Sequence, residues 1–487
     1  MRFLNVIEYV IIRAVRLHFG ICIAILVAWV LGLGLVPELK PYVEAVGRGH
    51  ALRQNTEYRA ALQAYTLAHR LHPHASFPSL QIAETYLALG RADKALPWYE
   101  QASADKATDP TVLTGWGQAY QKMGDTGRAV SLWQQIAGSS GCRADASYLL
   151  GIAALESGHL AEARTSLEAS LAAGNCGHFA QAASYWLGLL RTFDDAAQAR
   201  NDLQQATRGP DKGLADNARA IIQVLAETPD GAPPHRTMGA ALFNIGHWQL
   251  AQVHLEQALA DAPADVEALT YLGGALDRQG EGPLAESRLR QALALKPDQP
   301  LALYFWGKHQ ARQGELAPAR ETFERILALD PMNAAACAEI GRIYTAQRNY
   351  SLAETWFEKA RDRALDRPDF YLVLASFESD SLFNLAKGLE AARQAVALEP
   401  DNALAYDIAG WLSYVSGQRT EAETALQRAI ALEPGLISAY YHLGRLYESQ
   451  QRIDSARRAY GRVVDLGADN PVQGLAEEAL KQLGGAG

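Results

Sequence analysis

The apolar and polar positions of this chain form a helical pattern that recurs with a constant period. Pro263, Pro297 and Pro331 follow one another at equal spacing, and each closes a near-copy of one helix-turn-helix pattern that begins with a small residue and an aromatic residue. Proline lacks a backbone N–H and therefore ends the second helix. Because two short helices cannot bury an apolar face alone, the pattern predicts a stack of units that pack on their neighbours.

Three further positions keep the same register through these units. Small side chains are expected where the two helices of a unit cross closely, and a larger side chain is expected to fill the gap between successive units. The two small positions and the larger one are occupied by Gly273, Gly307 and Gly341, by Ala285, Ala319 and Ala353, and by Leu289, Phe323 and Phe357.

This pattern resembles the tetratricopeptide repeat (TPR), a motif of about 34 residues that runs through an aromatic residue, Leu-Gly, Tyr, then Ala, an aromatic residue or Leu, Ala and Pro. The spacing of the three prolines matches the length of that motif. Extending the frame in both directions gives about eleven or twelve units over most of residues 42–470. The resemblance implies an all-α fold, a right-handed α-solenoid of these units.

Composition divides the chain into six predicted segments. A run with two consecutive prolines has poor helix propensity and separates two subarrays. The first subarray is degenerate near residues 180–228, where Arg200 stands at an alanine position. In chain order the segments are a basic cytoplasmic or interfacial segment (1–16), a transmembrane helix (17–36), the N-terminal subarray (42–228), the Pro-rich break (229–234), the C-terminal subarray (235–470), and a capping helix with a tail (471–487).

The transmembrane prediction rests on residues 17–36, which include no formally charged side chain. A helix of that length rises about 30 Å, the thickness of a bilayer core. A cleaved signal peptide is the alternative, but the end of the run lacks an A-x-A-like cleavage site. We therefore expect a single-pass protein of the plasma (inner) membrane that contacts the lipid bilayer through residues 17–36, and the basic N-terminal flank favours repeats on the extracytoplasmic side.

Charge and motifs restrict the function. With 45 basic and 54 acidic residues the formal net charge is −9, which argues against a nucleic-acid partner. The sequence has no P-loop, nucleophile-elbow, H-E-x-x-H or paired C-x-x-C motif. The segment 471–487, which follows the last full unit, is too short for a catalytic domain. We expect a protein that is not an enzyme, with no cofactor and no metal site.

Two cysteines form a candidate disulfide. Cys142 and Cys176 lie one repeat period apart, and so in equivalent loops of adjacent units. A bond requires Cα atoms within about 7 Å, which is closer than successive solenoid loops normally approach. Two unrelated thiols are therefore the alternative.

The resemblance also implies a partner-binding groove, because the first helix of each TPR unit lines the concave wall. Aromatic rings bury area at low entropy cost, and guanidinium groups bind carboxylates bidentately. This chemistry suits an extended peptide or a helix of a protein partner, although the rings could instead only pack or close the superhelix. The candidates are Tyr304, Lys308, Arg312, Arg342, Phe377, Asp407, Trp411, Tyr414, Tyr441 and Arg445.

Together these features predict a membrane-anchored, non-enzymatic TPR scaffold or adaptor. Its groove would bind protein partners during assembly of a cell-envelope or membrane complex. The alternative is a structural component of a secretion or exopolysaccharide-export machine. In that case the groove would bind a glycan or a porin, and aromatic faces such as that of Trp411 would stack on sugars.

Overall fold

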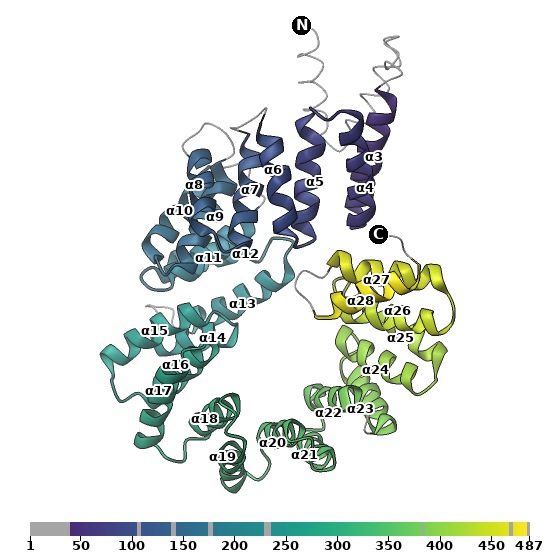
Figure 1. Ribbon diagram of the computed structural model, residues 1–487. Helices are drawn as coiled ribbons and strands as arrows, with labels where there is room; N and C mark the ends of the chain where they lie inside the picture. The colour runs from purple at the N-terminus through teal and green to yellow at the C-terminus, as the bar shows by residue number, and fades with distance from the viewer. Residues whose placement is uncertain are drawn as a thin grey trace. The chain divides into compact units, whose positions relative to one another are not determined.

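The described part of the chain is helical throughout. The computed structural model describes residues 39–104, 109–137, 143–173, 179–227, 235–381, 384–466 and 471–484. These residues form 26 α-helices, α3 to α28, and no strand (Figure 1). The predicted all-α fold is therefore confirmed for them. Contacts divide the chain into two compact units, the first formed mainly by residues up to Leu132 and the second mainly by residues from Trp133 on.

The helices follow one another in pairs. Twelve consecutive pairs account for all described helices except α13 and α28. Around the first compact unit lie α3 (Lys40–Gln54), α4 (Tyr58–Leu71), α5 (Ser76–Ala88), α6 (Ala92–Ser103), α7 (Pro110–Lys122) and α8 (Thr126–Ala137), the last of which runs into the second unit.

The second compact unit contains the longer run of pairs. Its helices are α9 (Arg143–Glu156), α10 (Leu160–Ala172), α11 (Ala180–Arg191), α12 (Ala196–Ala206), α13 (Lys212–Ala226), α14 (His235–Asn244), α15 (Trp248–Asp261), α16 (Val266–Arg278), α17 (Gly282–Leu295), α18 (Pro300–Arg312), α19 (Leu316–Leu329), α20 (Ala334–Ala346), α21 (Tyr350–Asp362), α22 (Pro368–Ser381), α23 (Leu385–Leu398), α24 (Ala403–Val415), α25 (Arg419–Leu432), α26 (Ile437–Ser449), α27 (Ile453–Leu466) and α28 (Pro471–Gln482).

The small positions lie where the two helices of a pair cross, as the sequence predicts. A Cβ atom added to Gly273 would lie 2.6 Å from Cγ of Leu289 and 3.3 Å from the carbonyl oxygen of Ala285. The same relation joins Gly341 to Phe357, at 2.6 Å. Because protein interiors are close-packed, only glycine fits at these crossings without a shift of the Leu289 or Phe357 side chain.

Substitution of these glycines measures how tight the crossing is. We expect Gly273→Ala to lower the free energy of unfolding by about 1–3 kcal/mol, because the added methyl group displaces Leu289. Gly461 of α27 is the matched control, since no atom lies within 4 Å of its added Cβ. Gly461→Ala should raise stability by up to about 1 kcal/mol through helix propensity. Urea denaturation checks both; stabilisation by both substitutions would contradict the tight crossing.

A turn glycine ends the first helix of many pairs. Gly280 and Gly314 have φ angles of 85° and 81°, and they occupy the same position one period apart. Arg348 takes this position in the next unit, with a φ of 57°. A side chain in the left-handed region costs about 1–2 kcal/mol. The turn geometry is thus imposed by the packing of the helix pair even where the residue does not favour it.

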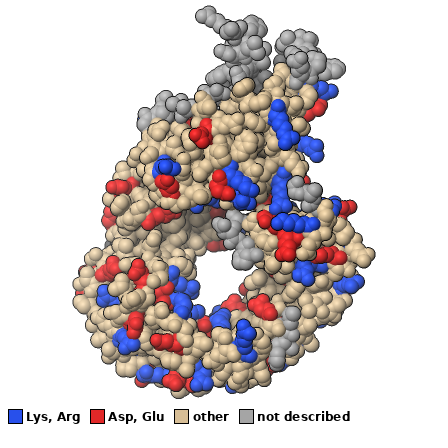
Figure 2. Space-filling view, viewed as in Figure 1, with Lys and Arg blue, Asp and Glu red and all other residues tan. Residues whose placement is uncertain are grey.

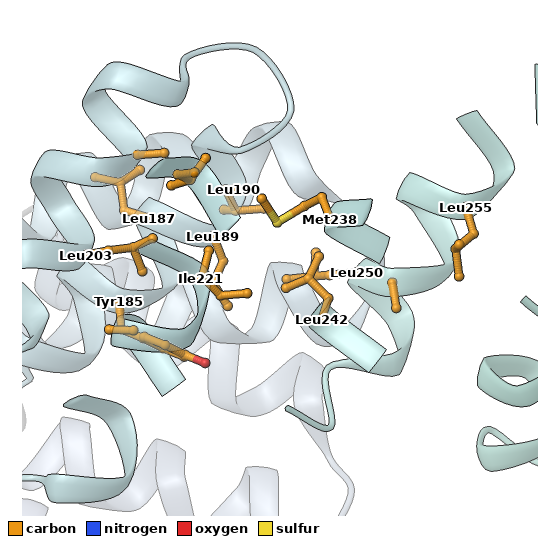
Figure 3. Packing of buried hydrophobic residues seen from close by; sticks show 14 of the residues in the cluster. Tyr185, Leu187, Leu189, Leu190, Leu203, Ile221, Met238, Leu242, Leu250 and Leu255 are labelled. Carbon is orange, nitrogen blue, oxygen red and sulfur yellow. The ribbon is translucent and has the colours of Figure 1, made fainter. Parts of the chain in front are cut away.

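Helix α13 breaks the alternation of pairs but shares the core of its neighbours. It buries Ala218, Ile221 and Leu225. One buried cluster includes these side chains together with others of α10 to α17, and Figure 3 shows Ile221 among the leucines of α11 and α14. The predicted Pro-rich break at 229–234 lies outside the described residues, and the division into two subarrays stays a prediction.

None of the described helices has both the length and the apolar character needed to cross a bilayer. The longest, α3 and α13, have 15 residues each. Such a helix rises about 22 Å, whereas a bilayer core is about 30 Å thick. By this finding the predicted single-pass inner-membrane location is wrong, and the predicted lipid contact has no support. The predicted segments 1–16 and 17–36 themselves lie outside the described residues.

Candidate partner-binding surface

The first helices of consecutive pairs contact one another in the second compact unit. Contacts join α16 to α18, α18 to α20, α20 to α22, α22 to α24, and α24 to α26. Their side chains therefore form one continued surface, which we call the first-helix wall. All ten predicted site residues belong to these helices, from Tyr304 on α18 to Arg445 on α26.

One buried carboxylate organises the wall between α18 and α20. Glu339 is 6% exposed, and its Oε1 accepts hydrogen bonds from Tyr304 Oη at 3.0 Å, Lys308 Nζ at 3.1 Å and Arg342 Nη1 at 2.6 Å. Burial, together with the negative charge of Glu339, raises the pKa of the Tyr304 phenol above its ordinary value. Three predicted site residues from two units are thus fixed by a carboxylate that sequence reasoning missed.

A second buried carboxylate joins α16 to α18. Oδ1 of Asp277 lies 2.9 Å from Nδ1 of His309, and Oδ2 accepts a hydrogen bond from Arg312. The side chain of Asp277 is 6% exposed, whereas that of Arg312 is 38% exposed. The same arrangement thus occurs at two successive units of the wall. In each, a buried carboxylate (Asp277 or Glu339) binds an arginine that is partly open to solvent (Arg312 or Arg342).

The other end of the wall is aromatic. The rings of Trp411 and His442 stack with centroids 4.5 Å apart, and His442 Nδ1 lies 2.7 Å from Oδ1 of Asp407. The Tyr414 ring lies 5.5 Å from that of Trp411. On α26, Arg445 Nη1 donates to the hydroxyl oxygen of Tyr441 at 3.4 Å. These rings are only half-buried, so they present apolar area next to an exposed guanidinium.

Two predicted site residues are packed inside rather than presented. Phe377 is 5% exposed and its ring lies 5.0 Å from that of Phe357. Asp407 is 2% exposed and contacts His442. Their place in the repeat frame is that of a surface position, but neighbouring side chains cover them. Their contribution to a partner site is to hold other residues in place.

Models of the tetratricopeptide repeat match residues 46–110, 114–175, 236–300, 310–377 and 409–471. The chain belongs to the tetratricopeptide repeat family. No curated protein sequence matches it. Among solved structures, yeast Tom70 is similar with 16% identity and a TM-score of 0.43, over 91% of this chain and 95% of that one. YrrB, described as a TPR protein with an unusual peptide-binding site, is similar with 22% identity and a TM-score of 0.33, over 40% of this chain and 97% of that one.

Three more rings of this TPR protein lie on first helices and are absent from the predicted set. Phe243 of α14, Tyr271 of α16 and Phe305 of α18 are half-buried, and their ring centroids are 5.2–5.9 Å apart. We call them the three-ring cluster. Tyr271 and Phe305 stand one repeat period apart in the sequence, a signal that could have revealed them.

The exposed charge beside this cluster is mainly positive. Helices α16, α18 and α20 carry four Lys and Arg residues and three Asp and Glu residues, of which Asp277 and Glu339 are buried. On the face drawn in Figure 2, acidic and basic side chains are interspersed. These three helices thus carry one basic residue more than acidic residues, and Lys308, Arg312 and Arg342 are hydrogen-bonded to the two buried acids.

The remaining candidates are the cysteines and the possible metal ligands. Cys142 and Cys176 lie outside the described residues, so the disulfide stays a prediction. Cys337, by contrast, is buried in α20 as a free thiol. In the part of the chain that the structure describes, no group of three or more His, Cys, Asp and Glu side chains could hold a metal ion.

Proposed function

We propose that this TPR protein is a non-enzymatic scaffold whose first-helix wall binds an extended segment of a partner protein. In this proposal the repeats form a right-handed superhelix of about eleven or twelve units. The partner segment contributes carboxylates to the wall between α16 and α20, and apolar side chains to the aromatic end on α24 and α26.

The arrangement around Glu339 carries the proposal. An arginine has five N–H donors, and Arg342 uses one nitrogen on Glu339 while its side chain stays 50% exposed. The guanidinium is therefore held in place and still has donors for a second carboxylate. Ordering before binding reduces the entropy that association costs, which favours recognition of an acidic partner at this point.

The aromatic end supports the same function by a different interaction. Trp411 and Tyr441 are half-buried beside exposed Arg445. Tryptophan, tyrosine and arginine dominate the energetics of protein interfaces, because each combines a large contact area with a polar group. A wall with cations at one end and rings at the other suits an extended segment better than a compact ligand.

Affinity capture from the source cells tests the proposal. We expect Trp411→Ala/Arg445→Ala to lower partner recovery at least tenfold relative to the wild type, since two anchors are removed. The matched control is Trp356→Ala/Arg428→Ala on second helices α21 and α25, which should leave recovery unchanged. Far-UV circular dichroism verifies that both variants fold. Equal recovery by the wall variant and the wild type would show that partners bind elsewhere.

A further inference from the structure

The three-ring cluster joins three consecutive units across a glycine. Phe243 and Phe305 belong to units on either side of α16, yet their ring centroids lie 5.2 Å apart. They meet over Gly274, whose added Cβ would lie 3.2 Å from both rings. Tyr271 lies 5.6 Å from Phe243 and 5.9 Å from Phe305. A side chain at 274 would separate rings that now form one apolar surface.

This apolar surface is incompletely covered by the chain itself. All three rings are half-buried, whereas Leu242, Leu272 and other residues of the same helices are buried in the core. Phe243 and Tyr271 pack in part against the core, and the exposed remainder of the three rings is apolar area that another apolar group can cover. The cluster therefore offers a ready contact area for one large side chain.

Positive charge flanks the cluster on the same helices. Arg278 stands two helical turns after Tyr271, and Lys308 and Arg312 follow Phe305 at one and two turns. The acids opposite them, Asp277 and Glu339, are buried and already hydrogen-bonded. A ligand at this place therefore meets rings first and cations beside them.

We propose that the three-ring cluster docks an aromatic or large aliphatic side chain of an acidic, extended partner segment, whose carboxylates lie against Arg278, Lys308 and Arg312. This inference rests on the proposed function and adds to it the class of partner and the position of a further apolar anchor, on α14, α16 and α18. The complementary charge determines the choice: a basic segment would meet Arg278, Lys308 and Arg312 as like charges, whereas an acidic segment can accept from the N–H groups that Lys308 and Arg312 do not use on Glu339 and Asp277. Extended segments present alternate side chains to one surface, which suits ring and cation contacts side by side.

A peptide array tests the inference with the full chain. The probe is a set of random dodecapeptides immobilised on a surface, and labelled protein is applied to it. We expect the bound peptides to be enriched in Phe, Tyr, Trp, Leu or Met within two or three residues of Asp or Glu. For a selected peptide in solution, fluorescence anisotropy should show at least tenfold weaker binding by Phe243→Leu or Phe305→Leu, because an anchor contact is lost.

Two comparisons make the outcome decisive. Trp356 is a half-buried ring on α21, outside the cluster. The Trp356→Ala variant should bind the peptide with the affinity of the wild type. Replacing the apolar residue of the peptide with serine should weaken binding by the wild type as much as the ring substitutions do. The ring variants and the wild type should then bind the serine peptide with equal affinity. Suppose that the ring variants bind the peptides with wild-type affinity, whereas Trp411→Ala/Arg445→Ala binds them more weakly. The inference is then overturned and the proposed function stands. If no peptide binds, both are overturned.

Discussion

Replacing Glu339 with alanine is expected to lower the free energy of unfolding by about 3–5 kcal/mol. The carboxylate is 6% exposed and accepts hydrogen bonds from Tyr304, Lys308 and Arg342. Its loss leaves the Tyr304 hydroxyl and the Lys308 ammonium half-buried without that acceptor. An unpaired buried polar group costs its full desolvation. Urea denaturation followed by circular dichroism measures the change.

Companion variants separate charge from packing at this site. Glu339→Gln keeps the shape of the side chain but loses its charge. Its free energy of unfolding should therefore lie between those of Glu339→Ala and the wild type. Lys308→Met in the Glu339→Ala background should restore part of the lost stability, because it removes the unpaired cation. Glu324→Ala, at an exposed position of α19, is the control and should change stability by less than about 0.5 kcal/mol. An alanine variant at 339 as stable as the wild type would mean that the carboxylate does not hold the two units together.

The second large effect is acid sensitivity at the contacts between α11 and α15. Thr192 donates its hydroxyl proton to the carbonyl oxygen of Leu189 at 2.6 Å, so its oxygen accepts from Nε2 of His254 at 3.0 Å. This leaves Nδ1 of His254 as the acceptor for Nδ1 of His235 at 2.9 Å. In this arrangement His254 is neutral, and a proton on its Nδ1 would force His235 to move its own proton from Nδ1 to Nε2.

Burial lowers the pKa of His254 to about 3, assisted by His235, and that of His247 to about 4. The ordinary value is 6.5, so between pH 6.5 and these values the unfolded chain binds protons that the folded chain does not. Stability is therefore complete above pH 6.5 and falls as the pH decreases. At pH 5 the loss is about 2 kcal/mol for each histidine. Protonation of either histidine places a charge in a buried site, beside Tyr185 for His247 and beside Thr192 for His254.

Glu378 acts in the opposite direction and has to be separated from the histidines. Burial raises its pKa to about 7 from an ordinary value of 4.5. A carboxyl group whose pKa is raised loses stability as the pH increases through that interval. Urea denaturation at pH 5 and pH 7.5 should therefore be compared between wild type and His254→Gln, both of which contain Glu378. We expect the loss on acidification to shrink by about 2 kcal/mol in the variant. His159→Gln, on an exposed residue, is the control; an equal loss in all three proteins would refute the assignment.

The repeat frame made most of the fold predictable. Gly273 and Phe323 lie where the frame placed them, because contacts within a unit and between adjacent units depend on residues at fixed spacing. The hydrogen bonds of His254 with Thr192 and of His247 with Tyr185 were not predictable. Each pair is 62 residues apart, a separation set by the single helix α13, which interrupts the regular spacing of the repeats.

The candidate site was predictable only in part. The frame identified the helix faces on which Tyr304, Arg342 and Trp411 lie. It could not show that Phe377 and Asp407 are covered, because burial depends on the side chains that adjacent units contribute. Glu339 was missed for the same reason: an acidic residue at an ordinary helical position becomes the centre of a cluster only when the preceding unit supplies donors to it. The apolar run at 17–36 satisfied a length rule, and the localisation inferred from it was wrong.

The buried acids of the first-helix wall bear on how such an array could grow by gene duplication. Asp277 pairs with Arg312, and Lys308 pairs with Glu339. An in-frame copy of residues 300–333 would give Asp277 the arginine of the first copy and Glu339 the lysine of the second. Both inherited carboxylates would keep a partner, and the cations left over would face solvent. The array could therefore lengthen at this place without leaving a buried carboxylate unpaired. Each added copy would make the first-helix wall more basic.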